Sequence, residues 1–190
     1  MNHQYDGYIS IPHDSYDQFK QATLGNGYNA DGYYGNQCWD YLAELWHQYG
    51  LTLYTGSRGY AYECWTVSKN RNAVTPFIAV EGIANIRRGD VIVLSGIPSL
   101  PAGHIAFADE DYNGSNYLNI LGQHQGESTS AVTSFVNVRN FEIGSRFLGI
   151  FRNTKWKSEP EPEPEPETDK KKRKFPYPVA WHHWQNFKRP

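Results

Sequence analysis

The chain has 190 residues and a mass of 21.8 kDa, enough for one ordinary domain with a sizeable core and about 30 further residues. Apolar residues make up 39% and glycine occupies 17 positions, so the composition is that of a globular protein and excludes disorder throughout. The net charge of -2 gives no reason to expect nucleic acid or a membrane surface as a partner. A mean hydropathy of -0.68 and short apolar runs exclude a transmembrane helix.

The first predicted helix lies between Asn36, a good N-cap residue, and Gly50, a good residue for ending a helix. Apolar side chains recur between them at the spacing of one buried helical face. They are Cys38, Leu42, Leu45, Trp46 and Tyr49. This pattern places Cys38 in the first turn. A second short helix is predicted over residues 60–68, with Cys64 inside it as a buried thiol.

From Gly89 onward the pattern changes to strands. The Asn113-Gly114 pair predicts a type I′ hairpin and therefore two antiparallel neighbours. Helices followed by an antiparallel sheet predict the α+β class. The predicted strands cover residues 90–95, 104–109, 117–122, 131–138 and 146–152.

The composition changes abruptly after Lys157, which is the predicted end of the domain covering residues 1–157. Residues 158–169 are dominated by alternating glutamate and proline, which predicts an extended linker because every proline fixes φ and lacks an N–H. Residues 170–190 form a basic, aromatic tail that is too short to fold independently.

Cysteine chemistry is the first functional hypothesis. The start of a helix carries positive potential, which favours a thiolate at Cys38. The Gln37 side-chain amide, together with the N–H of Cys38, is positioned to form an oxyanion hole. His104 opens an apolar strand, so we expect it at the strand edge, where it would act as the base. By itself, a cysteine and histidine pair at this separation is more often two structural residues than a catalytic pair.

Four segments in order, GYYGNQCWDYL, IRRGDVIVLSG, GHIAFA and NILGQHQG, resemble the CHAP family of cysteine, histidine-dependent amidohydrolases and peptidases. The resemblance covers nearly all of residues 20–152. It implies a papain-like α+β fold, with N-terminal helices on an antiparallel sheet, that hydrolyses amide bonds in peptidoglycan. It also implies that Cys38 is the nucleophile and His104 the general base.

The third catalytic position departs from the family pattern. Many relatives have an acidic residue and an asparagine two positions apart, whereas this chain has Gly122, Gln123 and His124. Because residues two apart on a strand share a face, His124 is predicted to point at His104 and orient it. The alternative is a surface strand residue with no catalytic role.

A loop before the helix resembles the calcium loop of some CHAP lysins. Calcium binds six or more oxygen atoms, so water would complete the shell. The alternative is a plain turn rich in Asn, Asp and Gly. The predicted ligands are Asn29, Asp31, the Tyr33 carbonyl and Asp40.

The resemblance implies a phage lysin, either an N-acetylmuramoyl-L-alanine amidase or an endopeptidase of the stem or cross-bridge peptide. The expected partner is peptidoglycan, with no nucleic acid, and we expect a monomer. The N-terminus lacks a signal peptide, which predicts a protein held in the host cytoplasm until a holin releases it to the wall. Two alternatives stay open: an effector amidase secreted or injected by bacteria, and a wall-binding module without catalytic activity.

Overall fold

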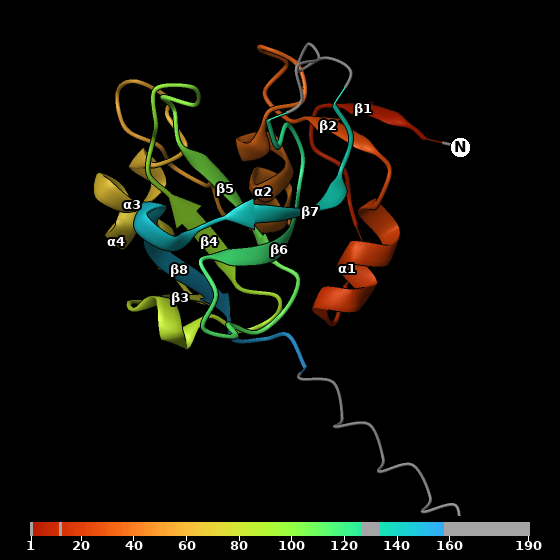
Figure 1. Ribbon diagram of the computed structural model, residues 1–190. Coiled ribbons are helices and arrows are strands. Elements are labelled where there is room, and N and C mark those ends of the chain that lie inside the picture. The colour runs from red at the N-terminus through yellow and green to blue at the C-terminus, as the bar shows by residue number, and fades with distance from the viewer. Residues whose placement is uncertain (1, 12, 127–133, 158–190) are drawn as a thin grey trace, which may run out of the picture. The chain divides into compact units, whose positions relative to one another are not determined.

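A six-stranded antiparallel sheet, with helices against one face, organises the chain in the computed structural model (Figure 1). The structure describes residues 2–11, 13–126 and 134–157, so the predicted linker and tail lie outside it. The α+β prediction is confirmed. The strand order is β3-β8-β4-β5-β6-β7. The strands are β3 (Phe77–Val80), β4 (Val91–Leu94), β5 (His104–Ala108), β6 (Tyr117–Gly122), β7 (Asn137–Glu142) and β8 (Phe147–Asn153).

Four of the five predicted strands match observed ones within two residues at each end, namely β4, β5, β6 and β8. In the described part of the strand predicted over residues 131–138, only Asn137 and Val138 are in a strand, because β7 runs from Asn137 to Glu142. Val136 instead exchanges backbone hydrogen bonds with the loop before β2: its carbonyl accepts from Gly25 and its N–H donates to Asn26, both at 2.8 Å. Strand β3 was not predicted.

Strands β5 and β6 pair antiparallel, as the Asn113-Gly114 signal predicted. The predicted turn type is wrong, because eight residues, 109–116, join the two strands. Asn113 Oδ1 accepts a hydrogen bond from the N–H of Ser115 at 2.9 Å and so stabilises a local turn inside this longer loop.

Helix α2 (Cys38–His47) occupies the predicted segment. Its N-cap is Gln37 and not Asn36, whose side chain hydrogen-bonds Gln4 instead. The N–H of Gln37 donates to Asp40 Oδ2 at 2.9 Å, which satisfies a free donor at the helix start. Gly50 has a φ of +68° just beyond the helix, where a left-handed residue is needed to turn the chain.

The other helices are shorter than α2. The predicted second helix is a single turn, α3 (Glu63–Thr66), followed by α4 (Lys69–Asn72), and Cys64 is fully buried as predicted. Helix α1 (Tyr16–Thr23) was not predicted, although Ser15 caps it by accepting from the N–H of Gln18. No helix in the described part of the chain is both long and apolar enough to cross a membrane.

A two-stranded parallel sheet lies beside these elements. It pairs β1 (Gln4–Asp6) with β2 (Gly27–Asn29) and sits near α1 at the right of Figure 1. Strand β2 leads directly into the loop before α2, so its position influences where Cys38 lies.

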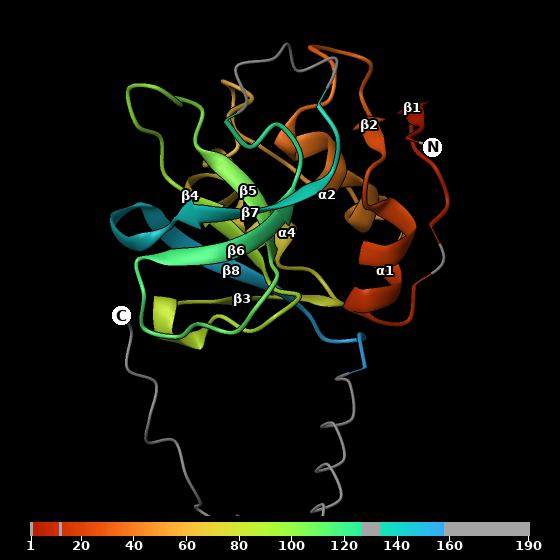
Figure 2. The same ribbon diagram turned by 45° about the vertical axis from the view of Figure 1, so that its right-hand side comes forward.

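The core has two parts on opposite faces of the sheet. The larger part joins α1 and α2 to the face that bears Ile105 and Phe107. The smaller part contains Ala106 and Ala108 and lies inside the curve of the sheet, where β6 and β7 cross in front of β4 and β5 in both views (Figure 2). The alternation along β5 follows from the two-residue period of a strand.

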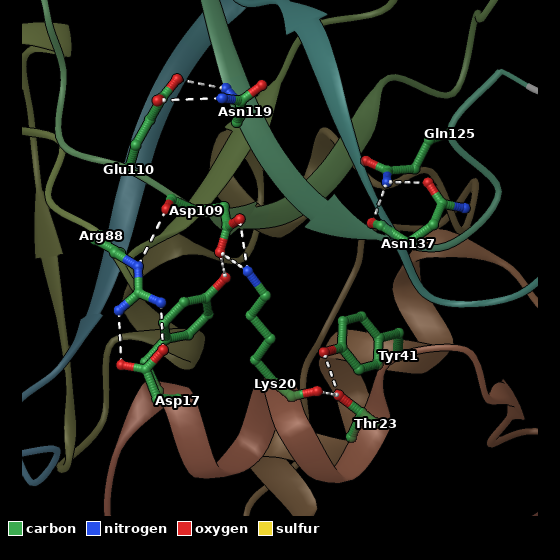
Figure 3. Close-up of polar contacts among 11 residues, drawn as sticks. Asp17, Lys20, Thr23, Tyr41, Arg88, Asp109, Glu110, Asn119, Gln125 and Asn137 are labelled. Carbon is green, nitrogen blue, oxygen red and sulfur yellow. Dashed lines mark hydrogen bonds and ion pairs between the residues drawn. The ribbon is translucent and has the colours of Figure 1, made fainter.

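Helix α1 is held to the end of β5 through Asp109 (Figure 3). The Asp109 carboxylate accepts from Lys20 Nζ at 2.6 Å and from the Tyr16 hydroxyl at 2.7 Å. Arg88 adds an ion pair with Asp17 on the same helix. On the next turn, the hydroxyls of Thr23 and Tyr41 are 2.8 Å apart, which joins α1 to α2. These contacts fix the helical layer on the sheet.

Candidate active site

Cys38 is the first residue of α2, and its thiol lies in the core that α2 shares with the sheet. Burial raises the pKa of Cys38 to about 11, and the nearby Asp40 charge adds to this, although the backbone N–H of Ile105 acts in the opposite direction. The predicted preference for a thiolate is therefore wrong. Burial outweighs the helix dipole, and the thiol keeps its proton at neutral pH.

His104 is the first residue of β5, and it is completely buried. The predicted position at a strand edge is wrong, because β4 and β6 flank β5 and the ring stacks on Phe141 with 5.1 Å between centroids. Burial lowers the pKa of His104 to about 3, the Gln125 side chain opposes this shift, and the charge of Arg146 adds to it. The imidazole is therefore neutral at physiological pH.

Cys38 and His104 both lie near the start of β5: His104 is its first residue, and the Cys38 thiol is close to its second. The Cys38 thiol approaches the N–H of Ile105, the residue directly after His104. The side chain of Ile105 faces α2, whereas His104 lies against Phe141, which packs on the opposite core. Among the described residues no hydrogen bond joins the thiol to the imidazole. The structure thus places the two predicted residues at neighbouring points without bringing them into contact.

The ring nitrogens of His104 have an unusual environment. Within the described chain, neither Nδ1 nor Nε2 has a partner in hydrogen-bonding geometry, although buried polar atoms are nearly always paired. A neutral, unpaired imidazole nitrogen is able to accept a proton. The lowered pKa nevertheless makes this imidazole a weaker base than an exposed histidine, so the base role stays a prediction.

His124 does not occupy a strand position. Strand β6 ends at Gly122, and His124 has a left-handed backbone with a φ of +51°. The prediction that it shares a strand face with the catalytic site is therefore wrong. Its N–H donates to Ser134 Oγ at 2.6 Å, and its charged form would lower the pKa of His104. Its orienting role stays a prediction.

Gln125 is a site residue that sequence reasoning missed. Its side-chain Nε2 donates to the carbonyl and the side-chain oxygen of Asn137, at 2.8 and 3.1 Å, which ties the end of β6 to β7 (Figure 3). The same side chain is the group that favours the charged form of His104. No pattern in the sequence signals this role, because it depends on the turn that follows Gly122.

The Gln37 side chain forms a local contact: its Nε2 donates to the Tyr34 carbonyl at 2.8 Å. This bond holds the loop before α2 and occupies one of the two N–H groups of the amide. The predicted part of Gln37 in an oxyanion hole stays a prediction.

The predicted calcium ligands surround the loop before α2. Asp40 is buried, and burial followed by the nearby Asp31 charge raises its pKa to about 7. Asn29 Oδ1 is buried without a hydrogen-bond partner among the described residues. Tyr33 is exposed, and its N–H donates to Asp31 at 2.8 Å. No cluster of three or more His, Cys, Asp or Glu side chains suited to a metal occurs in the described chain. Only two of the four predicted ligands, Asp31 and Asp40, are carboxylates.

An open hollow of about 560 Å³ lies beside the loop that leads from β4 into His104. Tyr62, Ile97, Pro101 and Leu148 contribute to its lining, which is mainly apolar. Neither Cys38 nor His104 lines it. Its size is typical of sites for small ligands.

The sequence and the fold were compared with those of known proteins. No family model matches the sequence. A curated protein of Streptococcus phage B30, a D-alanyl-L-alanine endopeptidase, is 32% identical over 119 residues, which are 62% of this chain and 26% of that protein. The chain therefore spans about a quarter of the length of this relative. The crystal structure of the wild-type endolysin LysIME-EF1 matches with a TM-score of 0.60 and 19% identity, covering 75% of this chain and 65% of that one.

The chain has the fold of an endolysin. At 19% identity the structural match establishes the fold alone.

Proposed function

We propose that the chain is a peptidoglycan hydrolase of the CHAP type that cleaves an amide bond through Cys38. The observation that carries the proposal is the placement of the Cys38 thiol at the start of α2, against the N–H of the residue that follows His104. The similarity to a phage endopeptidase and the fold shared with an endolysin support the substrate class. We also propose that the protein is held in the host cytoplasm and then released to the cell wall.

The proposed reaction starts from a protonated thiol and a neutral imidazole. Because the two side chains do not touch in the structure, the proposal requires a bridging water that carries the thiol proton to His104 as the sulfur attacks the amide carbonyl carbon. The carbonyl oxygen becomes an oxyanion held by the N–H of Cys38 and by Gln37. The tetrahedral intermediate collapses, and the amine leaves with the proton from the imidazolium. Water then hydrolyses the thioester, which releases the acid and restores the thiol.

The similar phage protein suggests which bond is cut. Because the similar phage protein is a D-alanyl-L-alanine endopeptidase, we propose cleavage of a peptide bond in the stem or cross-bridge. The second candidate is the muramoyl-alanine amide. Mass spectrometry of the released muropeptides distinguishes the two, since only an amidase separates the whole peptide from the sugar.

The Cys38→Ala variant tests the nucleophile in a turbidity assay on purified Gram-positive walls. We expect lysis to fall at least about 1,000-fold, because no other group in this mechanism forms the acyl-enzyme. Cys64→Ala, at the other buried cysteine, is the matched control and should keep most of the activity. Lysis that survives in Cys38→Ala would reject the cysteine mechanism.

The same assay separates catalysis from wall binding. Cys38→Ala should still sediment with the walls, because the substitution removes one sulfur atom and leaves the surface unchanged. If the unsubstituted protein sediments with walls and never clears them, the chain is a wall-binding module and the hydrolase proposal is wrong. An effector amidase would show the same cleavage, and the phage origin of the relative favours the lysin.

We further propose calcium as a structural ion in the loop before α2. The supporting observations are the two neighbouring carboxylates of Asp31 and Asp40 and the unpaired buried oxygen of Asn29. The Tyr33 carbonyl would be the fourth protein ligand. A bound cation would neutralise the two acidic side chains and stabilise the loop that leads to Cys38.

A further inference from the structure

Gln123 links three segments that meet at the start of α2. It follows the last residue of β6, and its side chain is completely buried. Its Oε1 accepts from the N–H of Tyr28 at 3.1 Å, and its Nε2 donates to the Tyr28 carbonyl at 2.6 Å. The amide thus pairs with β2 as the backbone of a neighbouring strand would.

The second N–H of the same amide reaches the segment before the nucleophile. Gln123 Nε2 donates to the Gln37 carbonyl at 2.7 Å. Nε2 faces two carbonyl oxygens, which can only accept hydrogen bonds. Just one orientation of the amide therefore satisfies all three hydrogen bonds.

The Gln37 carbonyl and the Cys38 N–H belong to the same peptide unit. In a planar trans peptide these two groups point in opposite directions, so holding the carbonyl fixes the direction of the N–H. A hydrogen bond to the carbonyl also polarises the peptide and makes its N–H a stronger donor. In the proposed reaction this N–H stabilises the oxyanion.

We propose that Gln123 is a positioning residue, which aims the Cys38 N–H at the oxyanion by holding the Gln37 carbonyl. The proposal rests on the function proposed above. It assigns to the position between Gly122 and His124 a role that does not require His124.

A matched control exists in the same domain. Asn72 is also completely buried and forms the same three bonds elsewhere: its Oδ1 accepts from the N–H of Tyr54, and its Nδ2 donates to the Tyr54 and Cys64 carbonyls at 2.7 and 2.9 Å. Loss of either amide leaves one N–H and two carbonyls, each buried or partly buried, without this partner. The two substitutions should therefore destabilise the protein to a similar extent.

The experiment compares Gln123→Leu with Asn72→Leu in the full chain, using initial lysis rates over a range of wall concentrations. For Gln123→Leu we expect the apparent kcat per folded molecule to fall roughly 10- to 100-fold, because a misdirected donor loses much of its effect on the transition state. The apparent KM should change less than about twofold, since the oxyanion forms after binding. Asn72→Leu should keep its kcat per folded molecule.

A second measurement separates an aiming defect from damage to the thiol. Alkylation of Cys38 by iodoacetamide needs the sulfur and no oxyanion, so its rate in Gln123→Leu should stay within about threefold of the parent rate. If Gln123→Leu does not fold, Gln123→Met preserves the length and flexibility of the side chain and takes its place. The proposal is overturned if kcat is unchanged in the folded variant, or if Asn72→Leu loses as much kcat.

The outcomes also separate this proposal from the one on which it rests. Lysis that persists in Cys38→Ala rejects the cysteine mechanism and, with it, any oxyanion role for the Cys38 N–H. Inactive Cys38→Ala together with fully active Gln123→Leu rejects only the role of Gln123.

Discussion

His104 and Cys38 lie in surroundings that disfavour charge, so the resting pair is a thiol and a neutral imidazole. Burial raises the pKa of Cys38 and lowers the pKa of His104. A preformed thiolate and imidazolium pair would place two charges in the core at high cost. The proton is therefore expected to move during the attack on the substrate, in a single proton-coupled step.

The buried His104 should make the free energy of unfolding decrease at acid pH. Its pKa is about 3 in the folded chain and near 6.5 when exposed, so the unfolded state binds more protons between these values. The free energy of unfolding is therefore unaffected by His104 above about pH 6.5, and it falls as the pH decreases from there toward 3. The loss is expected to be about 1.4 kcal/mol per pH unit in that range.

His104→Gln removes this contribution, because an amide does not titrate. Urea unfolding between pH 7 and pH 4 should show a gap between the two proteins that changes by about 3 kcal/mol, with the unsubstituted chain losing more stability in acid. Parallel curves for the two proteins would show that His104 is not a buried neutral group in solution.

Helix α2 is fixed at both of its ends, which explains how it can hold the candidate nucleophile in place. At the N-terminal end, Gln123 hydrogen-bonds the Gln37 carbonyl. At the other end, the Trp46 ring stacks on Phe77 of β3 with 3.9 Å between centroids, and its indole N–H donates to the Asn72 carbonyl. Aromatic stacking and burial of this size add substantially to stability.

The loop before α2 is the element at which calcium should act. In thermal unfolding, 10 mM calcium should raise the stability of the full chain by about 1.4 to 2.7 kcal/mol, if the affinity lies in the 0.1 to 1 mM range of weak extracellular sites. Asp31→Asn removes one of the two charged ligands and should abolish the increase. Magnesium at the same concentration is the control ion, because it dehydrates reluctantly and favours a smaller octahedral shell. An increase that persists in Asp31→Asn would place the ion elsewhere.

At the scale of the whole molecule, Trp156 anchors the last described segment of the chain. Its ring centroid lies 5.8 Å from that of Phe107 and 6.0 Å from that of Phe19, which joins the segment after β8 to the core that contains these two rings. Residues 158–190 lie beyond this contact. A protein that stops after Lys157 is therefore predicted to keep the folded domain.

Truncation after Lys157 should leave the midpoint of thermal unfolding within roughly 2 °C of that of the full chain, since no core contact of the described residues is removed. Truncation after Lys155 deletes the Trp156 ring and should cost about 1 to 3 kcal/mol, because the ring is partly buried. Calorimetry on the three proteins checks both values. A large loss of stability in the Lys157 protein would show that the tail contributes to the fold.

The sequence by itself determined the elements whose signals are local. The buried stripe from Cys38 to Trp46 specifies α2, and apolar runs bounded by Gly and Asp specify β4 and β5. The first-turn position of Cys38 and the strand start at His104 also marked these two residues as candidates, and the resemblance to the CHAP family implied their roles. These signals are read from neighbouring residues, so they need no knowledge of the tertiary fold.

Only the tertiary structure decided the chemical environment of the site. Burial reversed the expected thiolate at Cys38, and the end of β6 at Gly122 removed His124 from the strand face. Gln123 reaches Tyr28 and Gln37 across 95 and 86 positions, respectively. Desolvation and long-range hydrogen bonds depend on what packs around a group, which residue spacing does not encode.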